Sequence, residues 1–385
     1  MNHTYLLDAL APLVFRSGKP FGSQAGADGG NFPLPSSLAG LVRTLHADQT
    51  GQGFSPKLRE EISVAGPLLA RRAKDGKITP LLPKPADALY FKDGEATRVI
   101  RSSPAELPTG SGCDLPVGLL PVQAEEGVAG KPVSGAQYWS LQHLLDWGAG
   151  KTLTFDNLQA EGQDSLSIEE RTHVALDAKT GASAEGQLFQ TGGIDLSSQR
   201  QDRGAWDEHD LVFLGHSDVE LHDDLANFGG ERRLSRFSVA AADAWPVMPS
   251  TLEADIRKAG GLRLTFVTPA IFSAGYRPGW LDEALSGSPP GAPQQLKLKL
   301  RAAAVERWLP VSGWDLAAGG KGGKPRAVRK AVAAGAVYWF ELIGEIPEGF
   351  IQSLWLQSLA DQEQDRRDGF ALALPAPWTP PNTQN

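Results

Sequence analysis

The apolar and polar residues of this chain alternate with period two in several stretches, which is the pattern of half-buried β-strands. Residues 262–268 place Leu262 and Leu264 on one side and Arg263 on the other, and residues 296–301 read LKLKLR. We therefore expect one face of each strand in a core, with the lysines of 296–301 pointing outward. Shorter apolar stretches predict further strands at residues 1–15, 171–176, 186–189, 211–214, 336–343 and 370–374.

Other stretches have the spacing of amphipathic helices. After Pro-Leu-Pro at residues 33–35, apolar residues recur at positions i, i+3, i+4 and i+7 counted from Leu38, and Ser36 or Ser37 is suited to cap the helix. Further helices are predicted at residues 134–147 and 350–360.

Helices interposed between strands in both halves of the chain predict an α+β fold with two sandwiches. A chain of 385 residues is long for one domain, and we expect one module over residues 1–250 and another over 251–385. Glycine (43) and proline (28) are abundant, above all between residues 66 and 132. This composition favours short strands and turns, and it argues against an all-helical bundle.

Composition and charge narrow the possible partners and compartments. The formal charge is −8, with 37 basic and 45 acidic residues. Non-specific coating of nucleic acid needs phosphate neutralisation over a broad surface, so this charge argues against it but allows a local basic groove. The single cysteine, Cys113, excludes an internal disulfide and fits a reducing cytosol. Neither a signal-peptide pattern nor an apolar run of about 20 residues occurs, so we expect a cytoplasmic protein that does not enter membranes.

Two motifs that suggest ligand sites lack part of their pattern. Residues 148–152 read GAGKT, but a phosphate-binding loop needs a glycine at Leu145 and a helix after the loop, whereas we expect a helix before it and a strand at 153–155. The second motif is a set of histidines among acidic residues, at spacings of seven and six that match no compact metal site: His209, His216 and His222. An exposed polar hairpin explains these histidines equally well. We therefore expect no metal and no cofactor.

A different pattern favours RNA binding, namely cations set beside glycines or aromatic residues. Glycine lets a backbone approach closely, guanidinium groups pair with phosphate, and aromatic rings stack on bases. Any single instance is explained more simply as surface charge on a turn. The instances are Arg16 and Lys19 around Gly18, Arg232 and Arg233 after Gly229-Gly230, Tyr276 and Arg277 after Gly275, and Lys321, Lys324, Arg326, Arg329 and Lys330 near a glycine-rich loop.

Taken in chain order, several segments resemble the RAMP superfamily of CRISPR-associated proteins, and within it the family of the third subunit of the Cmr (type III-B) RNA-guided effector complex. The resemblance runs nearly end to end. Its segments are PLVFRSGKPF (12–21), PLPSSLAGLVRT (33–44), RTHVALD (171–177), GGER (229–232), TPAIF (268–272), SGWD (312–315) and AGAVY (334–338).

This resemblance implies two ferredoxin-like, RRM-type modules and a non-catalytic role. The subunit would grip the repeat-derived 5′ tag of the crRNA, beside the large polymerase/cyclase-like subunit and the backbone RAMP subunits, and would meet target RNA only indirectly. Such systems leave sequence reading to base pairing, while the protein fixes geometry. Two positions depart from the family pattern: Ala336 replaces a serine, and Gly369-Phe370-Ala371 replaces Gly-Phe-Gly. A Cβ at Ala371 would limit how closely RNA approaches that loop.

The candidate RNA contacts are Arg16, Lys19, Ser36, Arg43, Arg171, His173, Arg232, Arg233, Tyr276, Arg277, Lys324 and Arg326. Two alternatives stay open. One is a metal-independent precursor-crRNA endoribonuclease of the same superfamily, with His46 or His173 as the base. The other is a pure protein scaffold whose basic loops face acidic neighbours.

Overall fold

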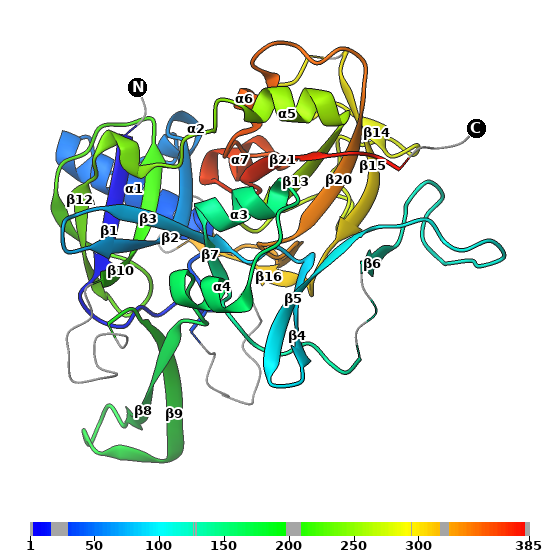
Figure 1. Cartoon of the computed structure of the whole chain (residues 1–385). Coiled ribbons are helices and arrows are strands. Elements are labelled where there is room, and N and C mark those ends of the chain that lie inside the picture. Colours follow the sequence, from blue (N-terminus) through cyan, green and yellow to red (C-terminus); the bar gives the residue numbers. More distant parts are fainter. Residues whose placement is uncertain are drawn as a thin grey trace. The chain divides into compact units, whose positions relative to one another are not determined.

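The chain forms two compact units, each assembled from three segments. The computed structural model describes residues 3–16, 30–125, 127, 129–197, 209–293, 295–315 and 323–381 (Figure 1). The first unit comprises Met1–Ile78, Leu166–Ala242 and Pro310–Lys330, and the second comprises Thr79–Ser165, Asp243–Leu309 and Ala331–Asn385. The two modules expected from the sequence, 1–250 and 251–385, stay a prediction. The compact units divide the chain differently, since their segments alternate along the sequence.

The first unit is built on an antiparallel sheet with strand order β11-β12-β1-β10-β2. Leu7 on β1 lies opposite both Phe237 on β12 and Phe213 on β10, so these three side chains share one face. Helix α1 contacts β2 and β11, and Leu38 on this helix lies where glycines at 66 and 215 leave room for its side chain. The elements are β1 (His3–Ala9), α1 (Pro35–Thr50), α2 (Leu58–Glu61), β2 (Val64–Ala73), β10 (His209–Ser217), β11 (Asp224–Asn227) and β12 (Leu234–Val239).

Two ribbons complete the first unit. Strands β8 (Ser167–Leu176) and β9 (Ser183–Asp195) pair from Ser167 opposite Asp195 to Leu176 opposite Ser183, and Figure 1 shows them as a long hairpin. In the other ribbon, β17 (Trp314–Asp315) pairs with β18 (Lys324–Pro325). The flanking strands β16 (Leu309–Val311) and β19 (Arg329–Ala331) also pair with each other.

The second unit contains a five-stranded antiparallel sheet with strand order β14-β15-β20-β13-β21. Helices α3, α5 and α6 contact β21. The N-terminal part of the unit contributes the strand pair β3-β7, which belongs to the same hydrogen-bonded sheet as β2, and a separate sheet, β4-β5-β6. The strands are β3 (Ile78–Pro83), β4 (Ala88–Asp93), β5 (Ala96–Pro104), β6 (Val122–Ala124), β7 (Tyr138–Ser140), β13 (Gly261–Phe266), β14 (Ser286–Gly287), β15 (Lys297–Ala304), β20 (Val337–Ile343) and β21 (Ala373–Trp378). The helices are α3 (Leu141–Gly148), α4 (Phe155–Glu161), a 3-10 turn at Ala242–Ala244, α5 (Leu252–Ala259), α6 (Phe350–Leu354) and α7 (Glu363–Asp368).

The predicted α+β class with antiparallel sheets is confirmed, and the strands with the clearest alternation are present as β13 and β15. Some boundaries were wrong. The helix expected at 350–360 ends at Leu354: Trp355 is extended, and Leu356 follows with a positive φ of 50° and donates its amide to the Ala373 carbonyl. Residues 138–140 of the expected second helix form a strand instead, β7.

Other expected caps and turns also differ in the structure. Helix α1 has Leu34 as its N-cap and Pro35 in its first turn, and no side chain caps it, so the prediction that Ser36 or Ser37 does so was wrong. The expected strand at 153–155 was also wrong: Thr154 accepts a hydrogen bond from the Asn157 amide and caps helix α4. Proline suits the first turn of a helix because its missing N–H is not needed there.

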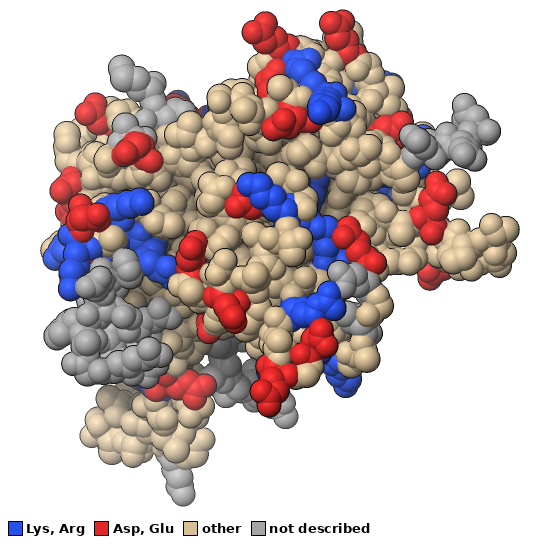
Figure 2. Space-filling view, in the orientation of Figure 1, with Lys and Arg blue, Asp and Glu red and all other residues tan. Residues whose placement is uncertain are grey.

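Charged side chains of both signs are interspersed on the surface. On the face seen in Figure 2, lysines and arginines lie among aspartates and glutamates. This mixture agrees with the formal charge of −8. On this face, a nucleic-acid contact would therefore depend on local groupings of cations, and not on a single broad field.

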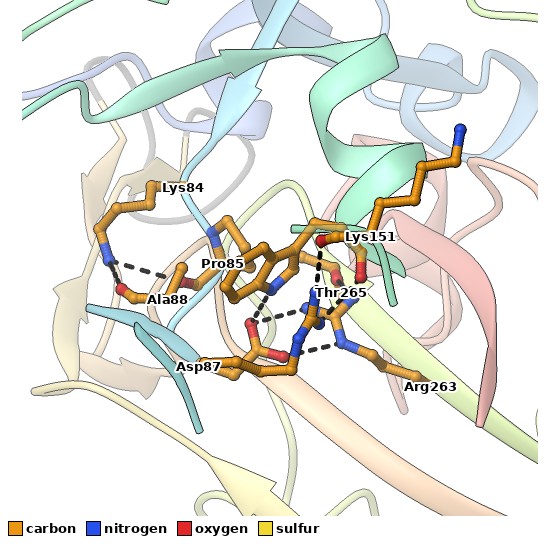
Figure 3. A network of polar contacts seen from close by, with 9 residues as sticks. Lys84, Pro85, Asp87, Ala88, Lys151, Arg263 and Thr265 are labelled. Atoms are coloured by element: carbon orange, nitrogen blue, oxygen red, sulfur yellow. Dashed lines mark hydrogen bonds and ion pairs between the residues drawn. The ribbon is translucent and has the colours of Figure 1, made fainter. Parts of the chain in front are cut away.

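A buried ion pair fixes the core of the second unit (Figure 3). Arg263 on β13 donates from Nε and one terminal nitrogen to the two carboxylate oxygens of Asp87, at 2.9 and 2.8 Å, and from the other to Thr265 Oγ1 at 2.8 Å. The indole of Trp147 on α3 donates to the same carboxylate at 3.0 Å. Asp87 and Arg263 are 1% and 4% exposed. The pair thus ties a turn, a strand and a helix end together where water does not compete.

Two further cations brace this network. The Arg101 guanidinium lies 3.6 Å from the centre of the Trp147 ring and donates to the carbonyls of Trp147 and Lys151 at 2.9 and 3.1 Å. The Lys84 ammonium donates to the Ala88 carbonyl at 2.7 Å, and burial lowers its pKa. Both cations bond to main-chain carbonyls, so Arg101 fixes the end of α3 and Lys84 fixes the turn that contains Asp87.

Replacing Asp87 by alanine should leave the Arg263 charge buried without its partner. We expect the free energy of unfolding to fall by about 3–5 kcal/mol, measured by urea denaturation followed through tryptophan fluorescence. Asp93→Ala is the matched control, because Asp93 is exposed and lies 3.7 Å from Arg98; it should cost less than about 1 kcal/mol. Equal losses in the two variants would show that the buried pair does not hold the unit together.

Candidate nucleic-acid interface

Residues 10–16, the clamp segment, join two parts of the first unit that are far apart in sequence. Leu13 exchanges two backbone hydrogen bonds of 2.8 Å with Ile194 on β9. The next residue, Val14, forms a bridge to Gly230, whose amide donates to the Val14 carbonyl at 2.7 Å. The clamp segment therefore holds the base of the β8–β9 hairpin and the loop at 228–233 in a fixed arrangement.

The loop at 228–233, the glycine loop, can follow this path only with glycine at its start. Gly229 has a φ of 90°, and a Cβ there would lie 2.8 Å from the Val14 carbonyl oxygen. Glu231 and Arg232 follow with positive φ values of 58° and 53°. Two successive non-glycine residues in this region carry a conformational cost that the surrounding contacts must offset. The sequence GGER is thus explained locally by close backbone approach and a tight left-handed turn.

Aromatic packing supports the loop from inside. The Phe228 ring lies 5.0 Å from Phe15 of the clamp segment and 6.0 Å from Phe213 on β10, in edge-to-face arrangements. The amide of Phe228 also donates to the Arg233 carbonyl at 3.0 Å. Phe228 is buried, so the loop is anchored to the sheet core while its charged residues face outward.

The clamp segment and the two segments that it joins all carry arginines. Arg16 ends the described part of the clamp segment and is exposed, as is Arg232 in the glycine loop. Arg233 pairs with Glu231 at 2.8 Å. Arg171 on β8 pairs with Glu169, and the carboxylates of Glu169 and, more weakly, Glu231 raise the pKa of Arg171. The bridges of Leu13 and Val14 place the base of the hairpin and the glycine loop on the two sides of the clamp segment.

One atom in this group lacks a partner. Within the described residues, the Arg233 Nε is buried without a hydrogen bond, although the Arg233 side chain as a whole is 18% exposed. A buried unsatisfied donor on a guanidinium is unfavourable. Arg233 thus has unused donor capacity next to the exposed Arg232.

The hairpin adds an aromatic surface next to Arg171. His173 on β8 lies opposite Phe189 on β9, and their rings stack at 5.2 Å with an angle of 18°. The His173 Nε2 lies 2.8 Å from the Thr191 hydroxyl, and Thr191 is opposite Arg171. Phe189 is 41% exposed. One face of the hairpin therefore carries a cation followed by a stacked pair of rings.

Phe189 was not among the residues predicted from the sequence. Its pairing with His173 depends on the register of the hairpin, which the turn at 177–182 sets. There the Asp177 carboxylate accepts from the amides of Lys179 and Thr180, and Gly181 has a φ of 69°. An aspartate followed by a glycine four residues later was the available signal for this turn.

Several predicted contacts lie elsewhere. Arg43 is 3% exposed and donates from Nε and a terminal nitrogen to the Ile62 carbonyl at 3.3 and 2.8 Å, so it ties α1 to the chain after α2, and its placement gives the predicted RNA contact no support. Ser36 is partly buried in the first turn of α1. Lys324 and Arg326 belong to the β17–β18 ribbon, where the Arg326 amide donates to Gly313. Lys19 and Lys321 lie outside the described residues.

Tyr276 and Arg277 lie in the second unit, on a loop that one carboxylate organises. Asp361 accepts hydrogen bonds from the amide and hydroxyl of Ser273, both at 2.7 Å, and from the Gly279 amide at 2.8 Å. The Tyr276 carbonyl accepts from the Tyr338 hydroxyl at 2.6 Å. The Tyr276 side chain is 38% exposed. The backbone of this loop is thus fixed while its aromatic side chain remains accessible.

Ala371, which stands where the family pattern has a glycine, lies inside the protein. Ala371 is 0% exposed, has a φ of 56°, and its amide donates to the Pro269 carbonyl at 2.9 Å. Its Cβ therefore packs within the second unit and does not project from the surface.

Two further observations concern metal ions and membranes. Among the residues that the structure describes, no three histidine, cysteine, aspartate or glutamate side chains come together as a metal site would require. In the same part of the chain, no helix combines the length and apolar character needed to cross a bilayer.

One family model matches nearly the whole chain. The model of the family described as CRISPR-associated protein (Cas_Cmr3) matches residues 5–378. No curated protein sequence matches. Among solved structures, a chain of "the Type III-B Cmr-beta bound to cognate target RNA" is 14% identical, with 95% of each chain covered and a TM-score of 0.49. A chain of the same assembly "bound to cognate target RNA and AMPPnP, state 1" is 13% identical, covers 87% of this chain and 86% of its own length, and gives a TM-score of 0.46.

A methyl group at position 229 should disrupt the contact between the glycine loop and the clamp segment. We expect Gly229→Ala to lose about 1–2 kcal/mol from the left-handed backbone and a further 1–3 kcal/mol or so from overpacking against Val14. Hydrogen exchange measured by mass spectrometry should be faster in peptides covering 12–16 and 228–233.

Gly51→Ala is the control for this prediction. Gly51 caps α1 in the same unit with a φ of 68°, and a Cβ there would meet nothing within 4 Å. Gly51→Ala should lose only the free energy that an alanine costs in the left-handed conformation, and hydrogen exchange in the two peptides should stay unchanged. If both variants behave alike, the close approach of Gly229 to Val14 is not what positions the loop.

Proposed function

Because the chain belongs to the Cas_Cmr3 family of CRISPR-associated proteins, we propose that it is a non-catalytic RNA-binding subunit of a type III-B CRISPR effector complex, acting in the cytoplasm. It holds the repeat-derived 5′ tag of the crRNA and docks the large polymerase/cyclase-like subunit and the backbone RAMP subunits. Target RNA then meets this subunit only through the assembled guide.

The observation that carries this proposal is the grouping of Arg16, Arg171, Arg232 and Arg233 around the clamp segment. These arginines come from three segments, and backbone hydrogen bonds from Leu13 and Val14 hold the segments together. Guanidinium groups bind phosphate with directional, charge-assisted hydrogen bonds. Arginines held beside two successive glycines, Gly229 and Gly230, suit a short run of single-stranded RNA backbone.

The hairpin face gives the same site a means to hold bases. The stacked rings of His173 and Phe189 lie next to Arg171 on one face. Single-stranded RNA is held mainly by stacking of unpaired bases on aromatic side chains together with backbone contacts. We propose that a base of the tag stacks on this pair while the neighbouring phosphates contact the arginines.

The order of strands supports a ferredoxin-like, RRM-type module in each unit. In the first unit, β12-β1-β10-β2 places the first strand between the fourth and third, with the second strand outside. In the second unit, β15-β20-β13-β21 has the same arrangement in the reverse direction. A helix follows the first strand in the first unit, and two helices precede the last strand in the second. RRM-type modules are common RNA-binding folds.

A binding role also suits the two histidines that could serve an endoribonuclease. His173 is held by its ring stacking on Phe189 and by Thr191, an arrangement that favours stacking over proton transfer. His46 lies on α1, and its Nδ1 is buried without a hydrogen-bond partner among the described residues. A general base needs a neighbour that orients it and access to the hydroxyl that it deprotonates.

Charge reversal in the glycine loop tests the RNA site. We expect Arg232→Glu with Arg233→Glu to weaken crRNA binding in the reconstituted complex at least tenfold, or about 1.4 kcal/mol. Two lost phosphate contacts should also make the slope of log K against log salt shallower by about 1.4, at about 0.7 per contact for single strands. The measurement is binding of labelled crRNA at several salt concentrations.

Lys74→Glu with Lys77→Glu is the matched control, because both lysines are exposed in the turn after β2 and the net charge changes equally. It should leave affinity and slope nearly unchanged. Arg232→Glu alone should retain part of the effect, since Arg232 is exposed and its replacement spares the Arg233–Glu231 pair. If crRNA is retained equally by all variants, the glycine loop is not the RNA site.

A further inference from the structure

The second unit carries a projecting loop, residues 105–121, which we call the arm. It connects β5 to β6 and extends from the β4-β5-β6 sheet in Figure 1. Residues 108–118 are exposed without interruption. The arm contains none of the residues of the proposed RNA site in the first unit.

The root of the arm is firmly attached. The Ala105 amide donates to the Pro121 carbonyl at 3.0 Å, and Pro104 pairs with Val122 just below. The Leu120 amide donates to the Arg301 carbonyl on β15 at 2.7 Å. Leu120 and Val122 also pack against the buried cluster of Ala302, Val337 and Trp339. The two ends of the arm are therefore bonded to each other, and its C-terminal end packs on the main sheet of the second unit.

Two tight turns give the arm a defined course. The Ser111 amide donates to Pro108 at 3.0 Å around Gly110, and the Leu119 amide donates to Pro116 at 3.1 Å around Gly118. Both glycines have positive φ, 86° and 93°. Such turns reduce the number of conformations that must be lost on binding.

The outer turn presents an apolar side chain to solvent. Val117, at the corner of the Pro116–Leu119 turn, is 99% exposed, and Leu115 is 39% exposed. Figure 2 shows the end of this projection without charged side chains. A fixed turn that holds an apolar residue in water can place that side chain in a pocket on another molecule with little loss of conformational entropy.

The charge of the arm indicates what kind of molecule that is. Residues 105–121 contain Glu106 and Asp114 but no lysine or arginine. RNA is a poor occupant, because its phosphates would be repelled and would find no cation. A protein surface with an apolar pocket rimmed by lysine or arginine would complement both the apolar tip and the acidic residues.

We propose that the arm docks into such a pocket on a neighbouring protein subunit of the effector complex. Val117 and Leu115 fill the pocket, and Asp114 meets its basic rim. This proposal rests on the proposed function, since it needs a protein neighbour in the complex. It assigns the arm to protein assembly and the glycine loop to RNA.

The only cysteine of the chain, Cys113, provides a probe on the arm itself, and it is exposed. The purified chain would be labelled at Cys113 with a benzophenone maleimide, assembled with crRNA and the other subunits, and irradiated. We expect a crosslink to one neighbouring protein subunit. A crosslink to a second copy of this chain, a crosslink to RNA, or no crosslink in the assembled complex would each overturn the proposal.

Val117→Asp tests the contribution of the apolar tip. It should reduce recovery of the neighbouring subunit on the tagged chain at least tenfold, with crRNA affinity of the remaining complex unchanged. Thr109→Asp is the matched control, because it adds the same charge to an exposed position of the arm away from the outer turn. Val117 is fully exposed, so both variants should keep the thermal unfolding temperature of the wild type.

The outcomes separate the two proposals. If the wild-type chain recovers protein subunits and crRNA, and Val117→Asp does so equally well, the arm proposal fails while the proposed function stands. If the wild-type chain recovers neither, both fail. If Arg232→Glu with Arg233→Glu loses crRNA while Val117→Asp loses only the protein neighbour, both are supported.

Discussion

The candidate site depends on the backbone hydrogen bonds that two adjacent residues, Leu13 and Val14, make on opposite sides of the clamp segment. In an extended backbone, successive residues direct their N–H and C=O groups to opposite sides. Leu13 therefore pairs with Ile194 on one side while Val14 pairs with Gly230 on the other. One short segment thus fixes a hairpin and a loop that lie far apart in sequence, without using a side chain. The side chains at the site are left for packing, as with Phe15, or for charge, as with Arg16.

The second unit achieves a similar result by a different interaction. There the buried Asp87–Arg263 pair links a turn, a strand and a helix end, and each charge is satisfied by several hydrogen bonds. A buried pair of this kind adds little net stability over apolar packing, but the loss of either partner is costly. It therefore acts mainly to specify one arrangement. The arm projects from the same unit, and its root depends on the sheet that contains Arg263.

The sequence predicted the regular elements better than the contacts between them. Strands β13 and β15 follow directly from alternation, and the helix from Leu38 follows from its apolar spacing. The helix expected at 350–360 is shorter because Leu356 and Leu359 donate their amides to Ala373 and Ala371 instead of continuing the helix, and local periodicity does not indicate these long-range bonds. Arg43 reads as a surface cation, yet it is buried because the Ile62 carbonyl needs a donor. The grouping of Arg16, Arg171 and Arg232 depends on long-range backbone bridges, and periodicity carries no information on these.

The presence of acidic residues among these arginines would explain how a chain of charge −8 can present the proposed RNA site. Glu169 and Glu231 pair with Arg171 and Arg233 and restrict their side chains. This pairing lowers the net positive charge of the group, so long-range attraction of RNA is weak. It also fixes guanidinium directions before RNA arrives, which reduces the entropy lost on binding. Such a site favours a short, defined stretch of backbone over bulk nucleic acid, because its affinity comes from matched geometry at a few phosphates.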